Sequence, residues 1–408
     1  MAPPPARFEI PARFEDLTAD WLQHALNDAD GRGASGAAVY GADAGGAGGV
    51  SVRGAGDGGL DPVAHGAPEA GLVEVASVAV EPLGASVGLL GDLARLRVSY
   101  RRGVGPETLI VKLPTADPGG HQVGSMLRAW AREVAFYQQV VPVSPGAQVP
   151  RCYHAAADPT AGRWVVVLED LVVDATPADG AAASADPVRD ATPDQARAAV
   201  DALAGFHARW WGSDRRFDWM PGFDTTGVGG LQGAWLDALP VFLKRYRHVV
   251  PHPTGEWLER FAPTLAAWSD RAAVEPLTVV HADYRLDNLI FSGGRVAMID
   301  WQTALRGPGA MDLTSFIATG LTTADRRVLE AELIERYVQG LIGAGVEIDR
   351  DWFERSYDEN LLWWMGQFAN NLARLEPEDP STQRALDTMI ERTYRAALDR
   401  NVGRLLTN

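Results

Sequence analysis

The chain is poor in three features that define whole classes of protein: cysteine, long apolar runs and positive charge. The single cysteine, Cys152, cannot form an internal disulfide or a cysteine zinc site, which points to a reducing compartment. No apolar run approaches the about 18 residues that a membrane-spanning helix needs, and the first residues lack the basic-then-apolar order of a secretory signal. We therefore expect a soluble cytoplasmic protein without a membrane partner.

The shortage of positive charge limits the partners further. The 408 residues contain 37 Lys and Arg against 53 Asp and Glu, which gives a formal net charge of -16. Like charge repels nucleic-acid phosphates and anionic lipid, so we expect no nucleic-acid partner. A content of 46% hydrophobic and 22% charged residues is typical of globular proteins, and the length exceeds what one hydrophobic core usually organises. These properties predict a globular protein with two structural units or with one unit that carries insertions.

Composition divides the chain into segments of different character. A short helix is expected at 14–27, behind a Thr18 cap, because its apolar residues recur at helical spacing. Two stretches rich in small residues, 29–70 and 172–191, offer too little apolar surface to offset the entropy of ordering, so we expect flexible insertions there. The predicted segments are a helical segment at 1–28, the first insertion at 29–70, a strand-rich domain at 71–171 and a mainly helical domain at 172–408.

The domain at 71–171 shows the alternation of apolar and polar residues that is typical of half-buried strands. A glycine-containing loop at 84–91 separates the first two strands, and one helical stretch interrupts the series. The predicted strands are 73–82, 94–100, 108–114 and 164–168, and the predicted helix is 126–140. Beyond residue 190 the pattern is mostly helical, apart from a hairpin with strands at 289–291 and 296–299.

The stretch HADYRLDNLIF, at 281–291, places polar residues directly after an apolar run. Asp283 and Asn288 lie in its loop, and Asp300 follows the second strand of the hairpin that begins after Asn288. Because the strands of a hairpin are antiparallel neighbours, Asn288 and Asp300 should emerge at the same edge. Carboxylate and carboxamide oxygens suit magnesium, which binds few protein carboxylates and keeps waters or substrate phosphates as its other ligands. Asp283 would lie nearby and accept a proton from a hydroxyl, which is the arrangement that phosphoryl transfer needs.

Three short motifs carry a family resemblance: LEDL at 168–171, HADYRLDN at 281–288 and IDWQ at 299–302. With them the chain resembles the aminoglycoside phosphotransferase and choline kinase superfamily, and it is most similar to the ecdysteroid-kinase-like branch and its bacterial relatives. The resemblance covers roughly 71–400. It implies an α+β, bilobal protein kinase-like fold, with a small N-lobe of antiparallel sheet plus one helix and a larger, mainly helical C-lobe.

The resemblance also implies a role for each matching residue. Asp283 would be the catalytic base, and Asn288 and Asp300 would bind Mg²⁺. Lys112 would pair with the α and β phosphates of ATP, held in place by Glu133.

Further residues would contact the nucleotide or support the site. The backbone of the loop at 84–91 would cover the phosphates, although this loop lacks the GxGxxG spacing of protein kinases. The nucleotide-binding residues of this loop would be Ser86, Val87 and Gly88, and those of the hinge that binds adenine would be Glu169 and Leu171. Asp312 would brace the catalytic loop from behind without taking part in the chemistry. Ala282 stands where the family more usually has glycine.

The resemblance predicts an ATP- and magnesium-dependent small-molecule kinase that phosphorylates a hydroxyl. The alternatives are a catalytically silent nucleotide-binding or scaffold protein of the same fold, or an aminoglycoside-modifying phosphotransferase. Ten of the 13 Trp follow residue 200, which would suit either core packing or a pocket for an apolar alcohol. An acidic group, Glu354, Asp358 and Glu359, would suit a polycationic aminoglycoside or be a solvated face. No Ala-Pro-Glu segment follows Asp300, which argues against a protein substrate.

Other polar residues near these motifs have simpler interpretations. We interpret His281 as a structural hydrogen-bonding residue and His207 as a helix residue that is satisfied locally. Arg285 and Asp287 are interpreted as a pair that stabilises the loop, with a phosphate or substrate contact by Arg285 as the alternative.

Overall fold

The computed structural model describes residues 9–28, 72–83, 91–115, 129–172, 190–224, 226–273, 276–292, 294–377 and 379–406. The chain forms two compact units: Met1–Met126 with Cys152–Glu169, and Leu127–Arg151 with Asp170–Asn408. We call them the sheet unit and the helical unit. The predicted insertion at 29–70 lies outside the described residues, as does most of the one at 172–191.

The sheet unit is built on a five-stranded antiparallel sheet with the strand order β1-β2-β3-β5-β4. The strands are β1 (Glu74–Pro82), β2 (Gly91–Arg102), β3 (Thr108–Pro114), β4 (Cys152–Asp158) and β5 (Arg163–Glu169). Four of them lie where the sequence predicted strands. Strand β4 was not predicted, because CYHAAAD lacks the alternation of apolar and polar residues that marks the others.

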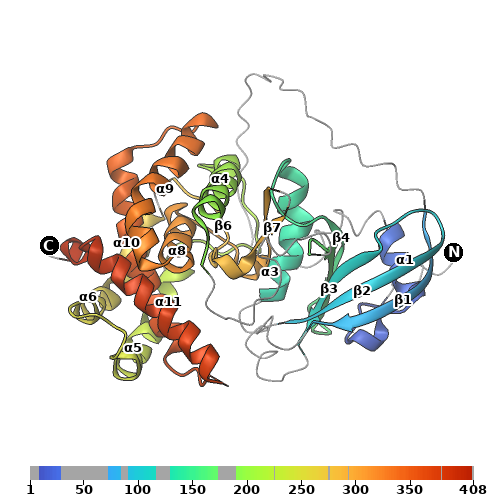
Figure 1. Cartoon of the computed structure of the whole chain (residues 1–408), viewed down its shortest axis with the longest axis horizontal. Helices are drawn as coiled ribbons and strands as arrows, with labels where there is room; N and C mark the ends of the chain where they lie inside the picture. The colour runs from blue at the N-terminus through green and yellow to red at the C-terminus, as the bar shows by residue number, and fades with distance from the viewer. Residues whose placement is uncertain are drawn as a thin grey trace, which may run out of the picture. The chain divides into compact units, whose positions relative to one another are not determined.

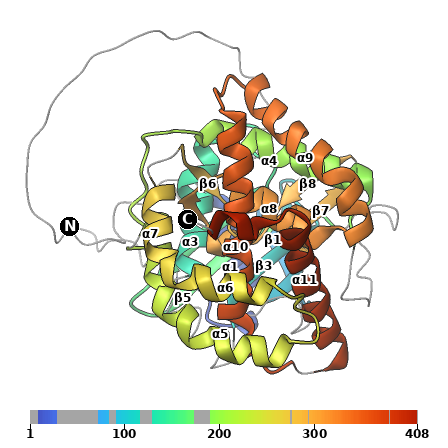
Figure 2. The ribbon, with the colours of Figure 1, turned by 90° about the vertical axis from the view of Figure 1, so that its left-hand side faces the viewer.

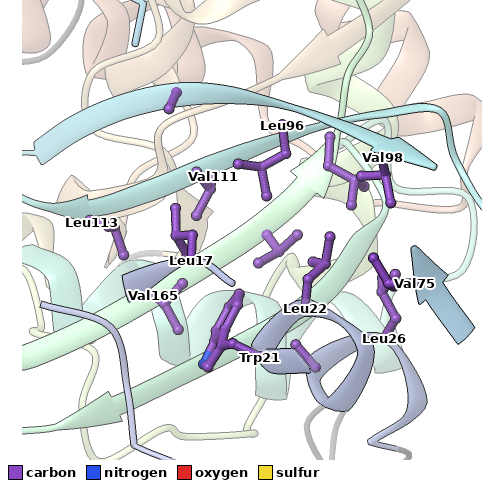
Figure 3. Close-up of a cluster of buried hydrophobic side chains, with 14 of the residues drawn as sticks. Leu17, Trp21, Leu22, Leu26, Val75, Leu96, Val98, Val111, Leu113 and Val165 are labelled. Atoms are coloured by element: carbon purple, nitrogen blue, oxygen red, sulfur yellow. The ribbon is translucent and has the colours of Figure 1, made fainter. Parts of the chain in front are cut away.

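Helix α1 (Ala19–Asn27) belongs to the sheet unit and packs against the sheet (Figure 1). The Thr18 hydroxyl caps it as predicted, accepting a hydrogen bond from the Trp21 amide at 3.2 Å. Trp21 and Leu22 point toward strand residues such as Val165 in one apolar cluster (Figure 3). At its end, the Asn27 side chain exchanges two hydrogen bonds with the Val73 backbone, at 2.8 and 2.9 Å. The segment predicted as a separate N-terminal piece therefore completes the core of the sheet unit.

The helical unit consists mainly of helices, and the short helix α3 (Ala129–Ala135) continues as a π-helix at 136–140. Helix α10 (Arg350–Leu372) contacts α5 (Gln232–Tyr246), α8 (Ala310–Gly320) and α11 (Pro380–Asp399), and Figure 2 shows it in the middle of these helices. The helices are α3 (Ala129–Ala135), α4 (Pro193–Trp210), α5 (Gln232–Tyr246), α6 (Thr254–Phe261), α7 (Leu265–Ala272), α8 (Ala310–Gly320), α9 (Thr323–Gly343), α10 (Arg350–Leu372) and α11 (Pro380–Asp399). Of the predicted helix at 126–140, residues 126–128 lie outside the described part. None of the helices that the described residues form has the length and apolar character needed to cross a bilayer.

Two short antiparallel strand pairs in the helical unit hold the polar motifs. Strand β6 (Thr278–Val280) leads into the HADYRLDN loop and pairs with β9 (Leu305–Gly307). Strands β7 (Leu289–Ser292) and β8 (Arg295–Met298) form the predicted hairpin. With the sheet and the mainly helical unit, these pairs complete the α+β class that the sequence predicted.

Candidate active site

The hairpin brings the ends of the two polar motifs to one edge, as the sequence predicted. Leu289 pairs with Met298, and the Ile299 amide donates a hydrogen bond to the Asn288 carbonyl at 3.0 Å. Asp300 follows immediately, in the left-handed region with φ 65°. This conformation is uncommon for residues other than glycine and recurs at functional sites. Asn288 and the backbone that carries Asp300 are therefore neighbours.

Asn288 also holds Asp283. The Asn288 side-chain amide donates to the Asp283 carbonyl at 2.8 Å and to the Asp283 Oδ2 at 2.9 Å. Asn288 is buried, whereas the Asp283 side chain is 31% exposed. The amide thus fixes the carboxylate from one side and leaves it open to a ligand.

Arg285 contacts Asp283 from the other side, a contact that the sequence analysis missed. Its Nε lies 3.2 Å from the Asp283 Oδ1, and its Nη1 lies 3.0 Å from the Asp287 Oδ2. The pair with Asp287 had been expected, but the residue also bridges to the proposed base. Attraction to Asp283, and to a smaller extent to Asp287 and Asp300, raises the pKa of the Arg285 guanidinium. The carboxylates of Asp283 and Asp300 therefore both lie within electrostatic range of Arg285.

Asp312 holds the start of the HADYRLDN loop. Its carboxylate is fully buried and accepts hydrogen bonds from the backbone amides of His281, at 2.6 Å, and Ala282, at 2.8 Å. Ala282 has φ 60°, a conformation that costs a residue with a Cβ free energy. Charge-assisted hydrogen bonds to two consecutive amides offset that cost. This geometry fits the bracing role that the resemblance implies for Asp312.

The interpretation of His207 as a locally satisfied helix residue is wrong. Its Nδ1 lies 2.6 Å from the Tyr337 hydroxyl, and its Nε2 lies 3.2 Å from the Asp312 Oδ2, and all three side chains are buried. Burial, and to a smaller extent Asp312, raises the pKa of Tyr337, so its hydroxyl keeps its proton and is able to donate to Nδ1, while the Asp312 carboxylate accepts from Nε2. We therefore assign the ring proton of His207 to Nε2, which donates to Asp312. The partners come from α4, α8 and α9, so no local sequence signal marks them.

Trp301, directly after Asp300, is the centre of an aromatic cluster. Its ring stacks on Phe136, at a centroid separation of 3.9 Å and an interplanar angle of 8°, and also contacts Phe206 and His281. The His281 Nε2 donates to the Ile299 carbonyl at 2.7 Å, in agreement with a structural role for this residue. Phe136 begins the π-helix that continues α3, and such π segments often occur at functional sites. The cluster thus ties the helix of Glu133 to the segment of Asp300.

The predicted phosphate-binding lysine lies in the sheet unit. Lys112 is buried on β3, between Leu93 of β2 and Val166 of β5. A Cβ added to Gly91 would come within 3.0 Å of the Trp164 Cη2 and within 3.3 Å of the Lys112 Cε. Glycine at position 91 therefore leaves the space that the lysine stem and the indole occupy.

The other predicted nucleotide contacts stay predictions. Glu133 is buried on α3 of the helical unit, and its pairing with Lys112 of the sheet unit remains an expectation from the resemblance. Glu169 ends β5, and the chain passes from the sheet unit to the helical unit between this residue and Asp170. The predicted hinge, which includes Leu171, therefore coincides with one of the three places where the chain passes between the units. The loop residues Ser86, Val87 and Gly88 lie outside the described residues.

The side chains at the hairpin edge fit magnesium by their donor chemistry. Because the Asn288 amide nitrogen is directed at Asp283, its Oδ1 is left as a neutral oxygen ligand. Asp300 supplies a carboxylate, whose Oδ2 accepts a hydrogen bond from the Gln302 amide at 3.1 Å. Within the described part of the chain, no group of three or more His, Cys, Asp or Glu is arranged to hold a metal ion. Two hard oxygen ligands fit an ion that takes its remaining ligands from phosphates and water.

The acidic group on α10 is neutralised within the chain. Arg400 binds Glu354 and Asp358, each at 2.6 Å, and Arg404 also binds Asp358. Glu359 pairs with Arg355 at 3.0 Å and accepts a hydrogen bond from the Trp268 indole at 3.1 Å. These carboxylates are therefore paired within the chain, which disfavours the cation site that was considered from the sequence.

Comparison with known proteins supplies the family. Residues 94–353 match the family described as the phosphotransferase enzyme family (APH), and this match spans more than half of the 408 residues. The chain belongs to this family, which confirms the resemblance at that level.

Individual relatives are more distant. A curated protein, the N-acetylmuramate/N-acetylglucosamine kinase of Neisseria meningitidis, is 30% identical over 94 residues. That match spans 22% of this chain and only 26% of the relative.

Solved structures of similar fold include a choline/ethanolamine kinase family protein from Mesorhizobium loti, 17% identical, with a TM-score of 0.43 over 81% of this chain and 93% of that one. An aminoglycoside phosphotransferase from Streptomyces rimosus is 23% identical, with a TM-score of 0.39 over 68% and 90% of the two chains.

Proposed function

We propose that this protein is an ATP- and magnesium-dependent kinase that transfers the γ-phosphate to a hydroxyl group of a small molecule. One observation carries the proposal: Asp283, Asn288 and Asp300 gather at one edge of the β7–β8 hairpin, with Asp283 bound to Asn288 and partly exposed. This arrangement offers a proton acceptor beside two oxygen ligands, as phosphoryl transfer requires. Membership in the phosphotransferase enzyme family supports the same chemistry.

In the proposed reaction, the Asp283 carboxylate orients the acceptor hydroxyl and takes its proton. The hydroxyl oxygen bonds to the γ-phosphorus while the bond from that phosphorus to the bridging oxygen of ADP breaks, and ADP leaves. Bound magnesium would be held by Asn288 and Asp300 and would neutralise charge on the nucleotide phosphates. Lys112 would bind the phosphates from the sheet unit, and Asp312 would keep the loop of Asp283 in its strained conformation.

The acceptor is proposed as a small, uncharged or apolar alcohol. An aminoglycoside is less favoured, because Glu354, Asp358 and Glu359 are already paired with arginines. Aromatic residues give no independent support for an apolar pocket, since seven of the ten Trp after residue 200 are buried in the core. The similarity of the motifs to the ecdysteroid-kinase-like branch supports the proposal of an apolar alcohol. Cytoplasmic location stays a prediction from the sequence.

The test is an ATP-consumption screen with the intact protein over aminoglycosides, choline-like amines, sugars and sterols. With an active acceptor, Asp283→Asn should lower turnover by about two to four orders of magnitude, as for loss of a general base, and should leave ATP binding nearly intact. Asp351→Asn, which changes an exposed carboxylate on α10, is the matched control and should leave turnover unchanged. Full turnover in Asp283→Asn would remove the assignment of the base. A wild-type protein that binds ATP but turns over no acceptor would favour the silent nucleotide-binding alternative.

A further inference from the structure

We propose that Arg285 is a second catalytic residue, which binds the transferring phosphoryl group and, in moving to it, exposes the Asp283 Oδ1 to the acceptor hydroxyl. This inference rests on the proposed function and adds to it a residue and a step that the family resemblance does not assign. It starts from the contact between a cation and the proposed base.

The position of Arg285 places its guanidinium beside the reacting atoms. The Nε lies 3.2 Å from the Asp283 Oδ1, and the Nη1 is held 3.0 Å from the Asp287 Oδ2. The side chains of Arg285 and Asp283 are 38% and 31% exposed, so both reach solvent and a ligand. Any group that approaches Asp283 to give up a proton therefore also approaches the guanidinium.

The hydrogen bonds of Asp283 show which carboxylate oxygen is available. Oδ2 accepts from the Asn288 amide, which is buried and is also anchored to the Asp283 carbonyl at 2.8 Å. Among the described residues, the contact recorded for Oδ1 is with Arg285, through one nitrogen of a side chain that is more than a third exposed. The contact with Arg285 is the one that can be exchanged without dismantling the loop. Oδ1 is therefore the atom that receives the acceptor hydroxyl.

The charge around the loop explains why the guanidinium moves from Asp283 to the nucleotide phosphates. Three carboxylates, Asp283, Asp287 and Asp300, attract Arg285 and raise its pKa, so the side chain stays charged. From His281 to Ser292 the chain has no other Lys or Arg. The phosphates of a nucleotide that arrives at this acidic edge need a cation from the helical unit, and Arg285 supplies it. A guanidinium binds phosphate oxygens in a fork and stabilises the charge that develops on them during transfer.

In the proposed step, Arg285 exchanges one contact for another and forms no covalent bond. The acceptor oxygen bonds to the γ-phosphorus, the bond from that phosphorus to the bridging oxygen breaks, and ADP leaves with the electron pair. The hydroxyl proton passes to the Asp283 Oδ1 and from there to solvent. Asp287 retains the other end of the guanidinium and limits how far it moves.

A purely structural role would give different measurements. If Arg285 only tied the loop together, its loss would lower the melting temperature and weaken ADP and ATP binding alike. A phosphoryl contact, in contrast, is made by ATP and not by ADP. The difference between the two affinities therefore separates the roles.

The experiment compares Arg285→Gln, Arg285→Lys and wild type by calorimetric titration with Mg²⁺-ADP and with a Mg²⁺-bound, non-hydrolysable ATP analogue. For Arg285→Gln we expect ADP affinity to stay within about threefold while the preference for the ATP analogue falls about tenfold, the size of one lost charge-assisted hydrogen bond. Turnover with an acceptor from the screen should fall about 10²- to 10³-fold, as for loss of a donor to the transition state. Arg285→Lys keeps the positive charge but lacks the paired N–H donors of a guanidinium. It should recover part of the preference for the ATP analogue and part of the turnover. Arg295→Gln, an exposed arginine on the same hairpin, is the control and should match wild type.

The two proposals fail in different ways. Wild-type turnover and an unchanged preference for the ATP analogue in Arg285→Gln would overturn the role of Arg285 and leave the kinase proposal intact. Equal loss of both affinities with a lower melting temperature would reduce Arg285 to a structural residue. The titrations need no acceptor, so they decide the matter even before one is found. A wild-type protein that binds neither nucleotide would overturn the proposed function, and the role of Arg285 with it.

Discussion

The sheet unit and the helical unit hold their proposed site residues by different means. In the sheet unit, Lys112 sits in a regular strand, fixed by ladder pairing with Leu93 and Val166 and by the space that Gly91 leaves. In the helical unit, Asp283 lies in an irregular loop that no ladder fixes, and buried polar groups hold it instead. The difference shows that strand geometry alone positions a residue, whereas a strained loop needs its own hydrogen-bonding partners.

The largest effect should follow from a change to those partners. Asp312→Asn replaces a carboxylate that accepts hydrogen bonds from two backbone amides and from His207. The side-chain nitrogen of the new asparagine is itself a donor and would lie against one or more of these donors. We expect the free energy of unfolding to fall by about 3 to 5 kcal/mol, the cost of breaking a buried charged network, together with most of the turnover. Chemical denaturation and the ATP-consumption assay would measure both.

A variant of the same network sharpens this prediction. Tyr337→Phe leaves the Asp312 contacts with the loop in place and removes only the hydroxyl that donates to the His207 Nδ1. It should lower the free energy of unfolding by about 1 to 3 kcal/mol and leave turnover nearly unchanged.

Equal stability and turnover in Asp312→Asn and wild type would refute the bracing role of Asp312.

In the sheet unit, one added methyl group should lower stability by about as much as Tyr337→Phe does in the helical unit. Gly91→Ala would bring a Cβ within 3.0 Å of the Trp164 ring and the Leu113 carbonyl, and close to Lys112. We expect it to lower the free energy of unfolding by about 1 to 3 kcal/mol and to raise the KM for ATP, because the lysine stem must move.

The matched control is Gly205→Ala in α4, where an added Cβ has no other atom within 4 Å. Alanine there should stabilise the protein by about 0.5 to 1 kcal/mol, since glycine is a poor helix former. If both alanine variants were stabilised alike, the close packing around Lys112 would be wrong.

The last effect depends on pH and comes from the sheet unit. Burial lowers the pKa of His154 to about 4, from an ordinary value of 6.5. The unfolded chain then takes up this proton at a higher pH than the folded one, so the contribution of His154 to stability falls as the pH decreases from about 6.5 to 4. Between pH 7.5 and pH 5 we expect a loss of about 2 kcal/mol, measured by chemical denaturation. His154→Gln should remove this part of the acid sensitivity, and an unchanged pH dependence in that variant would contradict the assignment.

Sequence periodicity was sufficient for regular elements with a strong pattern. It located β1, β2, β3 and β5, and the antiparallel pairing of the predicted hairpin placed Asn288 at the edge where Asp300 follows. It missed β4, whose small residues do not alternate, and also β6 and β9, which are three residues long. Strands this short carry too little pattern to be distinguished from loop.

The polar contacts of the site were harder to predict than its residues. Asp283 was identified from its motif and Asp312 from the family resemblance, but the contact of Arg285 with Asp283 depends on the conformation of the loop. The partners of His207 lie 105 and 130 residues away along the chain. A buried histidine on a helix has the same sequence signature whether its partner is local or distant. The packing of the helices determines which residue becomes the partner of this histidine, and no short pattern in the sequence indicates that packing.

The central claim is that the hairpin edge binds a nucleotide through magnesium, and calorimetric titration of Asp300→Ala with ATP tests it most directly. In wild type, Mg²⁺ should strengthen ATP binding relative to titration in EDTA. The same comparison with Asp300→Ala should show little or no strengthening, with the fold verified by circular dichroism. A folded Asp300→Ala protein that keeps the full effect of Mg²⁺ would contradict the account.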